Sequence, residues 1–205
     1  LFFTTRYGVV KRTSVTEFAN IRQNGLKALN LKDEDELINV FLTNGHADII
    51  IGTKMGYAVR FNENQVRNMG RAATGVRGVN LRADDHVVGA SVISNDQEVL
   101  VITEKGYGKR TLASEYATKG RGGKGMKTAN ITEKNGPLAG LMAVNGDEDL
   151  MIITNTGVII RTNVANISQT GRATLGVKVM RLDKGAQIVT FTSVAAENEK
   201  EVDEE

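Results

Sequence analysis

The chain has 205 residues, 40% of them hydrophobic and 24% charged, which is typical of a globular protein with a buried core. The absence of Cys excludes disulfides and cysteine-based catalytic or metal sites, and two His disfavour a His-rich metal site. The sequence contains no apolar run of about 18 residues, so no membrane span is predicted. The net charge of +2 combines a basic body with residues 197–205, which hold six acids and one Lys. Such asymmetry is typical of a protein with an anionic partner such as nucleic acid.

Four glycines divide the chain into four repeats of about 50 residues. Each has a Thr three residues before it and an Arg four residues after it. The glycines are Gly8, Gly56, Gly106 and Gly157; the threonines are Thr5, Thr53, Thr103 and Thr154; the arginines are Arg12, Arg60, Arg110 and Arg161. A Gly directly before a strand is typical of a hairpin turn, so each repeat is predicted to open with a hairpin.

A second set of glycines follows later in each repeat, with a cation two residues after each. The glycines are Gly25, Gly75, Gly125 and Gly176, and the cations are Lys27, Arg77, Lys127 and Lys178. In the last three repeats a Gly-Arg pair precedes this glycine and supplies Arg71, Arg121 and Arg172. The recurrence of both sets predicts that each repeat is one structural unit.

Each repeat is predicted to be β-structure. The apolar runs are four to six residues long and rich in Val and Ile, which favours strands over helices. The pattern Ser14-x-x-Glu17 predicts a single helical turn. About four strands per 50 residues is typical of a propeller blade. We therefore predict an all-β fold with blades at about 1–48, 49–98, 99–149 and 150–194, followed by an acidic disordered tail at 195–205.

Three stretches carry a resemblance to a known family. They are Lys-Gly-Tyr-Gly-Lys-Arg-Thr at Lys105–Thr111, Thr-Gly-Val-Arg-Gly-Val at Thr74–Val79, and Val-Ala-Asn-Ile-Ser-Gln-Thr-Gly-Arg at Val164–Arg172. The repeat resembles the C-terminal domain of the A subunit of DNA gyrase, with topoisomerase IV as a near relative. The resemblance covers residues 1–194, and the acidic tail fits it as well.

The resemblance implies a six-bladed β-pinwheel, a propeller in which neighbouring blades exchange strands, of which this chain holds the last four repeats. It also implies a basic outer rim that wraps double-stranded DNA, as part of a type II topoisomerase that introduces negative supercoils with ATP. The implied partners are DNA, the N-terminal breakage-reunion region and the B subunit of gyrase. ATP and Mg²⁺ would act elsewhere in the parent enzyme, so this segment is expected to carry no catalytic residue, cofactor, metal or small-molecule substrate. A bacterial cytoplasmic, nucleoid-associated protein without membrane contact is expected.

One loop departs from the pattern of the family. The signature box Gln-Arg-Arg-Gly-Gly-Lys/Arg-Gly belongs to the first of the six blades, and the third repeat here holds a partial copy. This box-like loop consists of Lys119, Gly120, Arg121, Gly122, Gly123, Lys124 and Gly125. Lys119 replaces Gln and Gly120 replaces the first Arg. The loop also matches Gly-x-Gly-x-x-Gly, but a strand is predicted after it, whereas a dinucleotide site requires a helix.

Cations that recur once per blade would form rings on a propeller, and such rings suit the regularly spaced phosphates of a bent duplex. The predicted DNA contacts are Lys11, Arg12, Lys27, Arg60, Arg71, Arg77, Lys109, Arg110, Lys119, Arg121, Lys124, Lys127, Arg161, Arg172 and Lys178. The alternative is that these cations are solvated charges or pair with acids such as Glu115.

Two other functions stay open from the residues alone. A propeller that binds a protein partner would scatter its cations and present an apolar face, and a propeller enzyme would gather acids or His at its central channel. We also considered that the acids of the tail compete with DNA phosphates for the basic rim. The position of the cations in the fold discriminates between DNA binding and protein binding.

Overall fold

The computed structural model describes residues 1–196, so the predicted tail lies outside the described residues except for its first two positions. The described part contains strands and short 3-10 helices and no α-helix, which confirms the all-β prediction. The first two repeats form β1 (Phe2–Thr5), β2 (Val9–Arg12), β3 (Leu37–Phe41), β4 (Asp48–Thr53), β5 (Tyr57–Asn62), β6 (Val76–Arg77) and β7 (Val87–Ile93). The last two form β8 (Glu98–Thr103), β9 (Tyr107–Leu112), β10 (Met126–Lys127), β11 (Leu138–Val144), β12 (Asp149–Thr154), β13 (Ile159–Asn163), β14 (Val177–Lys178) and β15 (Ile188–Val194).

In each repeat a 3-10 helix follows the second strand in chain order, which is β2, β5, β9 or β13. The 3-10 helices are η1 (Val15–Phe18), η2 (Glu63–Gln65), η3 (Ala113–Glu115) and η4 (Val164–Asn166). The predicted helical turn at Ser14 is confirmed as η1, in which the Ser14 side chain accepts a hydrogen bond from the Thr16 backbone N–H. These turns direct the chain toward the next blade.

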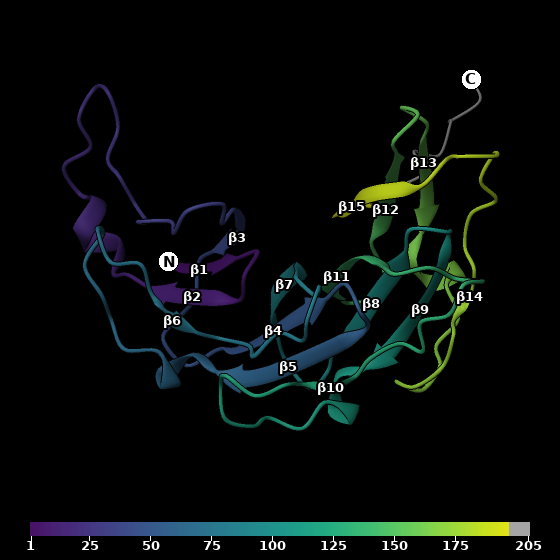
Figure 1. The fold of residues 1–205 in the computed structure, drawn as a ribbon, viewed down its shortest axis with the longest axis horizontal. Coiled ribbons are helices and arrows are strands. Elements are labelled where there is room, and N and C mark those ends of the chain that lie inside the picture. The colour runs from purple at the N-terminus through teal and green to yellow at the C-terminus, as the bar shows by residue number, and fades with distance from the viewer. Residues whose placement is uncertain (197–205) are drawn as a thin grey trace, which may run out of the picture.

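Four small antiparallel sheets follow one another in a curved, propeller-like row (Figure 1). Their strand orders are β3-β1-β2-β6, β7-β4-β5-β10, β11-β8-β9-β14 and β15-β12-β13. The outermost strand of each of the first three sheets comes from the following repeat, for example with Val10 paired to Val76. This arrangement is the strand exchange that the resemblance implied. Each predicted blade range therefore supplies three strands of its own sheet, and the second, third and fourth ranges also lend one strand to the preceding sheet.

The two ends of the row differ from its middle: the first repeat lends no strand, and the fourth sheet receives none within the described residues. Residues 20–36 of the first repeat contain no strand, and the fourth sheet has three strands within the described chain. Gly25 and Gly125 show the difference: both have positive φ, at 79° and 76°. A Cβ on Gly125 would lie 2.7 Å from the Ala58 carbonyl oxygen, whereas a Cβ on Gly25 would have no neighbour within 4 Å. Exchange, rather than turn geometry alone, makes the glycine necessary.

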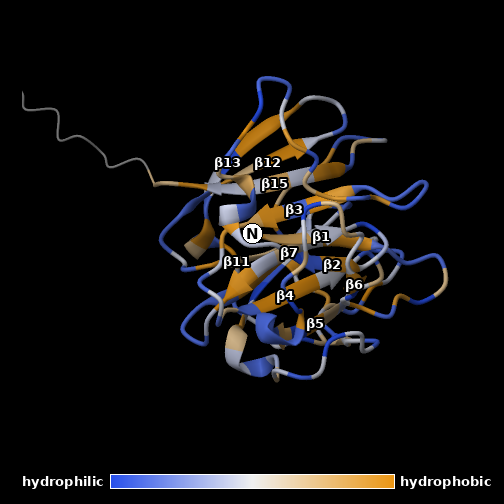
Figure 2. Cartoon of the chain, turned by 90° about the vertical axis from the view of Figure 1, so that its left-hand side faces the viewer, coloured by the Kyte–Doolittle hydropathy of each residue, from blue (hydrophilic) through white to orange (hydrophobic). Residues whose placement is uncertain are grey.

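The core is divided among the junctions between blades. One apolar cluster joins the first and second blades around Phe2, Phe61 and Ile51, and two equivalent clusters join the later pairs. In Figure 2 the strands carry most of the hydrophobic residues and the connecting loops most of the hydrophilic ones. A single four-stranded sheet cannot bury both of its faces, so stacking against a neighbour provides the core of each blade.

Candidate nucleic-acid interface

The exchanged strands place one cation each on the outer rim. Arg77 on β6, Lys127 on β10 and Lys178 on β14 are exposed, and each is the second residue of a two-residue outermost strand. Consecutive side chains of a strand point to opposite sides, so the preceding apolar residue and the cation face opposite ways. The fourth member of this set, Lys27, is also exposed, and its Nζ donates to Asn30 Oδ1 at 2.8 Å.

The box-like loop approaches the rim beside β10. Lys119, Arg121 and Lys124 are all exposed. Arg121 is nevertheless anchored, because its Nε donates to the Gln65 carbonyl at 2.9 Å and its NH1 to the Arg77 carbonyl at 3.0 Å. A cavity of about 200 Å³ lies under the loop. The strand β10 follows the loop, so the helix that a dinucleotide site requires is not formed here.

The other two arginines of the Gly-Arg pairs, Arg71 and Arg172, are half-buried. Arg172 NH1 donates to the Lys127 carbonyl at 3.2 Å, which repeats the contact of Arg121 with Arg77 one blade earlier. The guanidinium carbon of Arg172 lies 5.8 Å from the centre of the Tyr116 ring. Arg121 and Arg172 therefore link successive exchanged segments into a continuous belt.

The arginine four residues after each hairpin glycine has a different environment. Arg60 is 5% exposed and bridges two blades: its Nε donates to Asp48 at 2.9 Å and its NH1 to the Ala113 carbonyl at 3.0 Å. Burial alone would raise the pKa of Asp48. Hydrogen bonds from Thr118, Asn62 and Arg60 outweigh burial and lower that pKa. Asp48 is therefore held as the carboxylate partner of this bridge.

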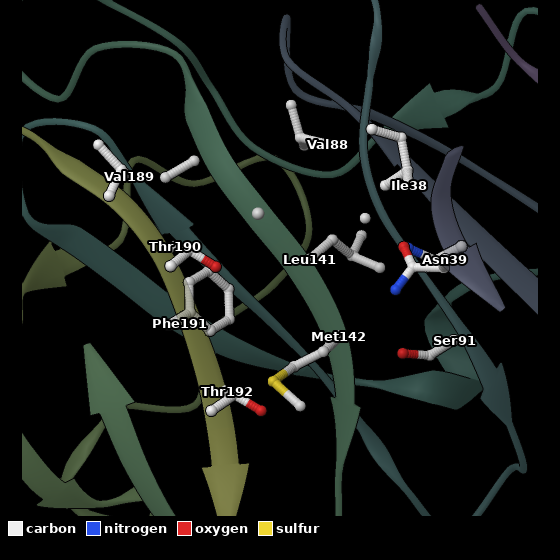
Figure 3. A pocket seen from close by; sticks show the side chains of 14 residues that line it. Ile38, Asn39, Val88, Ser91, Leu141, Met142, Val189, Thr190, Phe191 and Thr192 are labelled. Carbon is white, nitrogen blue, oxygen red and sulfur yellow. The ribbon is translucent and has the colours of Figure 1, made fainter. Parts of the chain in front are cut away.

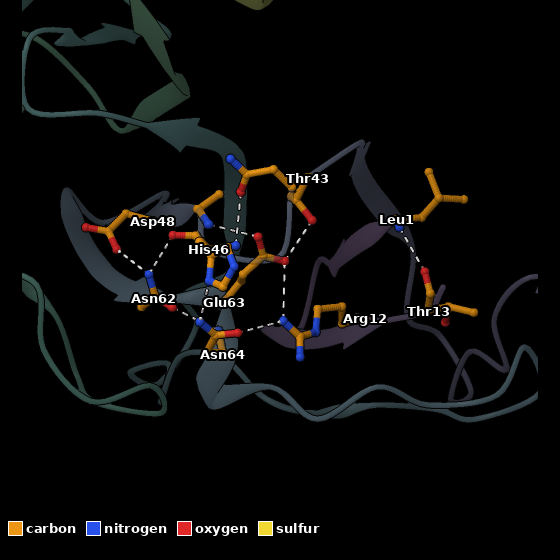
Figure 4. A network of polar contacts seen from close by, with 11 residues as sticks. Leu1, Arg12, Thr13, Thr43, His46, Asp48, Asn62, Glu63 and Asn64 are labelled. Carbon is orange, nitrogen blue, oxygen red and sulfur yellow. Dashed lines mark hydrogen bonds and ion pairs between the residues drawn. The ribbon is translucent and has the colours of Figure 1, made fainter. Parts of the chain in front are cut away.

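Equivalent bridges occur in the other blades. Arg12 NH1 donates to Asn64 Oδ1 at 3.2 Å and lies 3.6 Å from a carboxylate oxygen of the fully buried Glu63 (Figure 4). Arg110 pairs with Glu98, and its Nε donates to the Ile167 carbonyl at 2.7 Å. Arg161 pairs with Asp149 at 2.8 Å and is the most exposed of the four. Arg12, Arg60 and Arg110 thus join their blades to the 3-10 turn of the next blade, whereas Arg161 contacts Asp149 and the Ala195 carbonyl. All four arginines pair with acids, although Glu115 is not one of these acids.

Lys11 and Lys109 are placed inside the protein. They are 0% and 1% exposed. Lys109 Nζ donates to the Gly171 and Arg172 carbonyls of the next Gly-Arg pair, and Lys11 Nζ donates to the carbonyls of Ala28 and Arg71. Burial lowers the pKa of Lys109 to about 8 and also lowers that of Lys11. We predicted both lysines, together with Arg60, as DNA contacts; as placed here, none of the three reaches a phosphate without rearrangement.

One cation near the rim is absent from the contacts predicted from sequence. The Arg82 guanidinium carbon lies 3.3 Å from the centre of the Tyr57 ring, and its NH1 donates to the Lys124 carbonyl at 2.6 Å. Arg82 thus supports the box-like loop from the adjacent repeat. Arg82 lies seven residues after Gly75, and the equivalent residues after Gly25 and Gly125 are Lys32 and Thr132. Because a cation does not recur at this position in every repeat, the periodicity did not mark Arg82 as a candidate.

Uncharged residues line the centre of the row. The inner strands β3, β7, β11 and β15 line a cavity of about 300 Å³ (Figure 3) with apolar residues, glycines and uncharged polar residues, and none of the residues that line it is ionisable. Within residues 1–196, no group of three or more His, Asp or Glu is placed to hold a metal ion. Over the same residues, no helix is long and apolar enough to cross a membrane.

Blades joined by exchange of their outer strands, with cations on those strands, define a β-pinwheel with a basic rim. A model of the DNA gyrase C-terminal domain, a β-propeller, matches residues 1–44, 47–94, 97–145 and 148–195. The chain therefore belongs to the DNA gyrase C-terminal domain family.

Named relatives agree with this assignment. The A subunit of DNA gyrase from Streptococcus pneumoniae serotype 4 is 80% identical over 98% of this chain, and that of Halalkalibacterium halodurans is 62% identical over all of it. The chain spans only about a quarter of each of these proteins, at 25% and 24%. The solved C-terminal domain of DNA topoisomerase IV superposes with a TM-score of 0.90 at 28% identity, covering 96% of this chain and 62% of that one. The DNA gyrase A C-terminal domain gives 0.82 at 26% identity, covering 94% and 64%.

Proposed function

We propose that this domain binds double-stranded DNA without sequence specificity and bends it around the outer rim. The observation that carries the proposal is the exposure of Arg77, Lys127 and Lys178 on equivalent exchanged strands. Equivalent positions on successive blades repeat at a regular interval along a curved surface, as phosphates do along a bent duplex. Contacts of this kind supply affinity through counterion release and carry no base readout.

The proposal extends to a full-length A subunit of gyrase, of which this chain would form one part. In that protein, the domain presents a bent DNA segment to the breakage-reunion region, and ATP hydrolysis with the B subunit of gyrase drives negative supercoiling. DNA binding would place the protein at the bacterial nucleoid in the cytoplasm. The support is the family membership together with the positions of the cations on the rim.

The experiment measures duplex affinity against salt concentration for fragments of about 40 and 150 base pairs. We expect a steep fall of log K with log salt and tighter binding of the longer fragment, because bending permits more contacts. Arg77→Ala with Lys127→Ala should reduce the salt slope by about 1.8, close to 0.9 for each phosphate that the variant no longer neutralises.

The matched control removes two exposed cations that lie off the exchanged strands, Arg22→Ala with Lys32→Ala. It should leave the slope near the wild-type value. Equal losses from both pairs would indicate a general charge effect and contradict a rim-specific path. No binding by the wild-type domain near 50 mM salt would reject DNA binding and favour a protein-interaction propeller.

A further inference from the structure

A second basic feature lies beside the rim, between the third and fourth repeats. It is a groove of about 360 Å³ at the end of the blades that carries the β8–β9 turn. Three lysines line it, Lys105, Lys134 and Lys178, together with Leu182 and residues 185–187. Of the residues that line the groove, none is acidic. Lys178 lies on β14, so the groove is continuous with the cations of the rim.

The lysines converge around one aromatic ring. Lys178 Nζ lies 5.0 Å and Lys134 Nζ 5.9 Å from the centre of the Tyr107 ring. Lys105 Nζ donates to the carbonyl of Glu133, directly before Lys134 in the chain. Glu104, the acid next to Lys105, is engaged elsewhere, because it pairs with Lys54 at 3.0 Å. Like charges in a concave site repel one another and raise the local potential for an anion.

The equivalent turns of the first two repeats are acidic. Residues 33–36 are Asp-Glu-Asp-Glu, and residues 84–85 are Asp-Asp. The corresponding positions of the third repeat begin with Glu133 and continue with Lys134 and Asn135. The groove of the first repeat accordingly contains Asp35 beside Lys32 and Arg77. The third repeat thus reverses the charge at a position that symmetry would have made acidic.

A neutral side chain, Asn135, stands in place of the acid in the third repeat and has different hydrogen-bond partners. In the first repeat, the Asp35 carboxylate accepts the Tyr7 backbone N–H at 2.9 Å. In the third repeat, the Asn135 side chain holds its own turn by accepting the Thr132 backbone N–H at 2.8 Å. Asn135 holds this turn, and of the three lysines Lys105 also contributes through its bond to the Glu133 carbonyl. The gathering of three lysines at one groove without an acid in its lining points to an anionic ligand.

We propose that this lysine groove binds a phosphate group of the DNA backbone where the duplex passes from the rim onto the face of the third and fourth blades. The proposal rests on the proposed function and adds Lys105 and Lys134 to the residues that contact DNA. It makes the DNA path asymmetric, because the corresponding turns of the first two repeats carry acids, which repel phosphate.

The first test measures the salt dependence of duplex binding for Lys105→Gln with Lys134→Gln. We expect the slope to fall by about 1 to 2 and the affinity to fall about threefold to tenfold. Arg22→Gln with Lys32→Gln is the matched control, since it removes the same charge outside this groove, and it should bind as the wild type does. An unchanged slope for the groove pair would overturn the inference.

The second test locates the DNA directly. Because the chain has no Cys, Gln187→Cys places a single photo-crosslinking group on the wall of the groove. Asp96→Cys places the same group in the β7–β8 turn, at the opposite end of the blade. Cross-links to a duplex of about 150 base pairs from position 187 and not from position 96 are expected. Absence of a cross-link from position 187 under conditions of full binding would overturn the proposal.

The outcomes separate this inference from the function on which it rests. If Arg77→Ala with Lys127→Ala weakens binding while the groove pair does not, the rim path stands and the groove assignment fails. If the wild type binds no DNA, both fail together. If millimolar inorganic phosphate perturbs the groove while DNA neither cross-links nor responds to the groove variants, the ligand is free phosphate, and the assignment to the DNA backbone is overturned.

Discussion

Two sets of cations recur with the same period of about 50 residues, and the fold treats them in opposite ways. Arg60 and its equivalents Arg12, Arg110 and Arg161 pair with carboxylates. Arg60 and Arg110 also donate to backbone carbonyls of the next blade. Arg77 and its equivalents on the exchanged strands are exposed on the rim. The first set joins the blades, and the second set is available to a partner. Periodicity therefore marks equivalent positions in the fold and does not reveal which of them face solvent.

The difference arises from what each side chain meets in the neighbouring repeat. Arg60 and Arg110 meet carbonyls of the 3-10 turn in the next blade, and a buried guanidinium requires such acceptors. An exchanged strand is the last of its sheet, so its outward side chain meets no further strand. The following predictions test this contrast, from the largest expected effect on stability to the smallest.

Arg60→Met should destabilise the domain most. The change removes donors to Asp48, Asn95 and the Ala113 carbonyl and leaves the carboxylate without its buried partner. We expect a loss of about 3–5 kcal/mol in the free energy of unfolding. Urea denaturation measures it.

Arg161→Met is the matched control, at the equivalent position of the fourth blade. Its side chain is 33% exposed and pairs with Asp149. Exposed pairs contribute about 1 kcal/mol or less, so the loss should be correspondingly small. Losses of the same size at Arg60 and Arg161 would contradict the distinction between an enclosed bridge and an open one.

Gly125→Ala should have the next largest effect. A left-handed alanine costs about 1–2 kcal/mol, and the clash of its Cβ with the Ala58 carbonyl adds about 1–3 kcal/mol by displacing the exchanged strand. Gly25→Ala has the same backbone conformation without a neighbour and should cost at most the first amount. Thermal unfolding of the two variants measures both losses, and their difference is the contribution of strand exchange. Equal losses would show that this contribution is negligible.

Lys109→Met should destabilise the domain by about 1–2 kcal/mol at neutral pH, because the variant has no donor for the Gly171 and Arg172 carbonyls. The native pKa is about 8 against 10.5 for the ordinary lysine, so between these values the unfolded chain binds more protons. The stability of the wild type relative to the variant should therefore rise from pH 8 to pH 10.5. A constant difference across that range would contradict a buried ammonium.

Arg77→Ala with Lys127→Ala should change stability least, by about 0.5 kcal/mol or less, because exposed charges contribute little to folding. The same pair should weaken DNA binding most clearly. A stability loss above about 1 kcal/mol, measured in the same urea titrations, would place these cations with the structural set.

The number of repeats, their β-character and the hairpin glycines could all be predicted from the sequence. These depend on local chemistry, namely short apolar runs and turn residues that permit positive φ. The resemblance to the gyrase family added strand exchange, which no single repeat reveals because its pairing partner lies in another repeat. The rim cations Arg77 and Lys127 were also among the predicted contacts.

Which cations are enclosed and which are exposed depends on how neighbouring blades pack. Lys11 and Lys109 are buried because their ammonium groups meet carbonyls about 60 residues further along the chain, as the pairs Lys11–Arg71 and Lys109–Gly171 show. The lysine groove likewise forms from residues of two repeats that meet at one turn. The environment of a charge is set by contacts that are distant in sequence, so a repeating pattern fixes its position and the packing of neighbouring blades fixes its role.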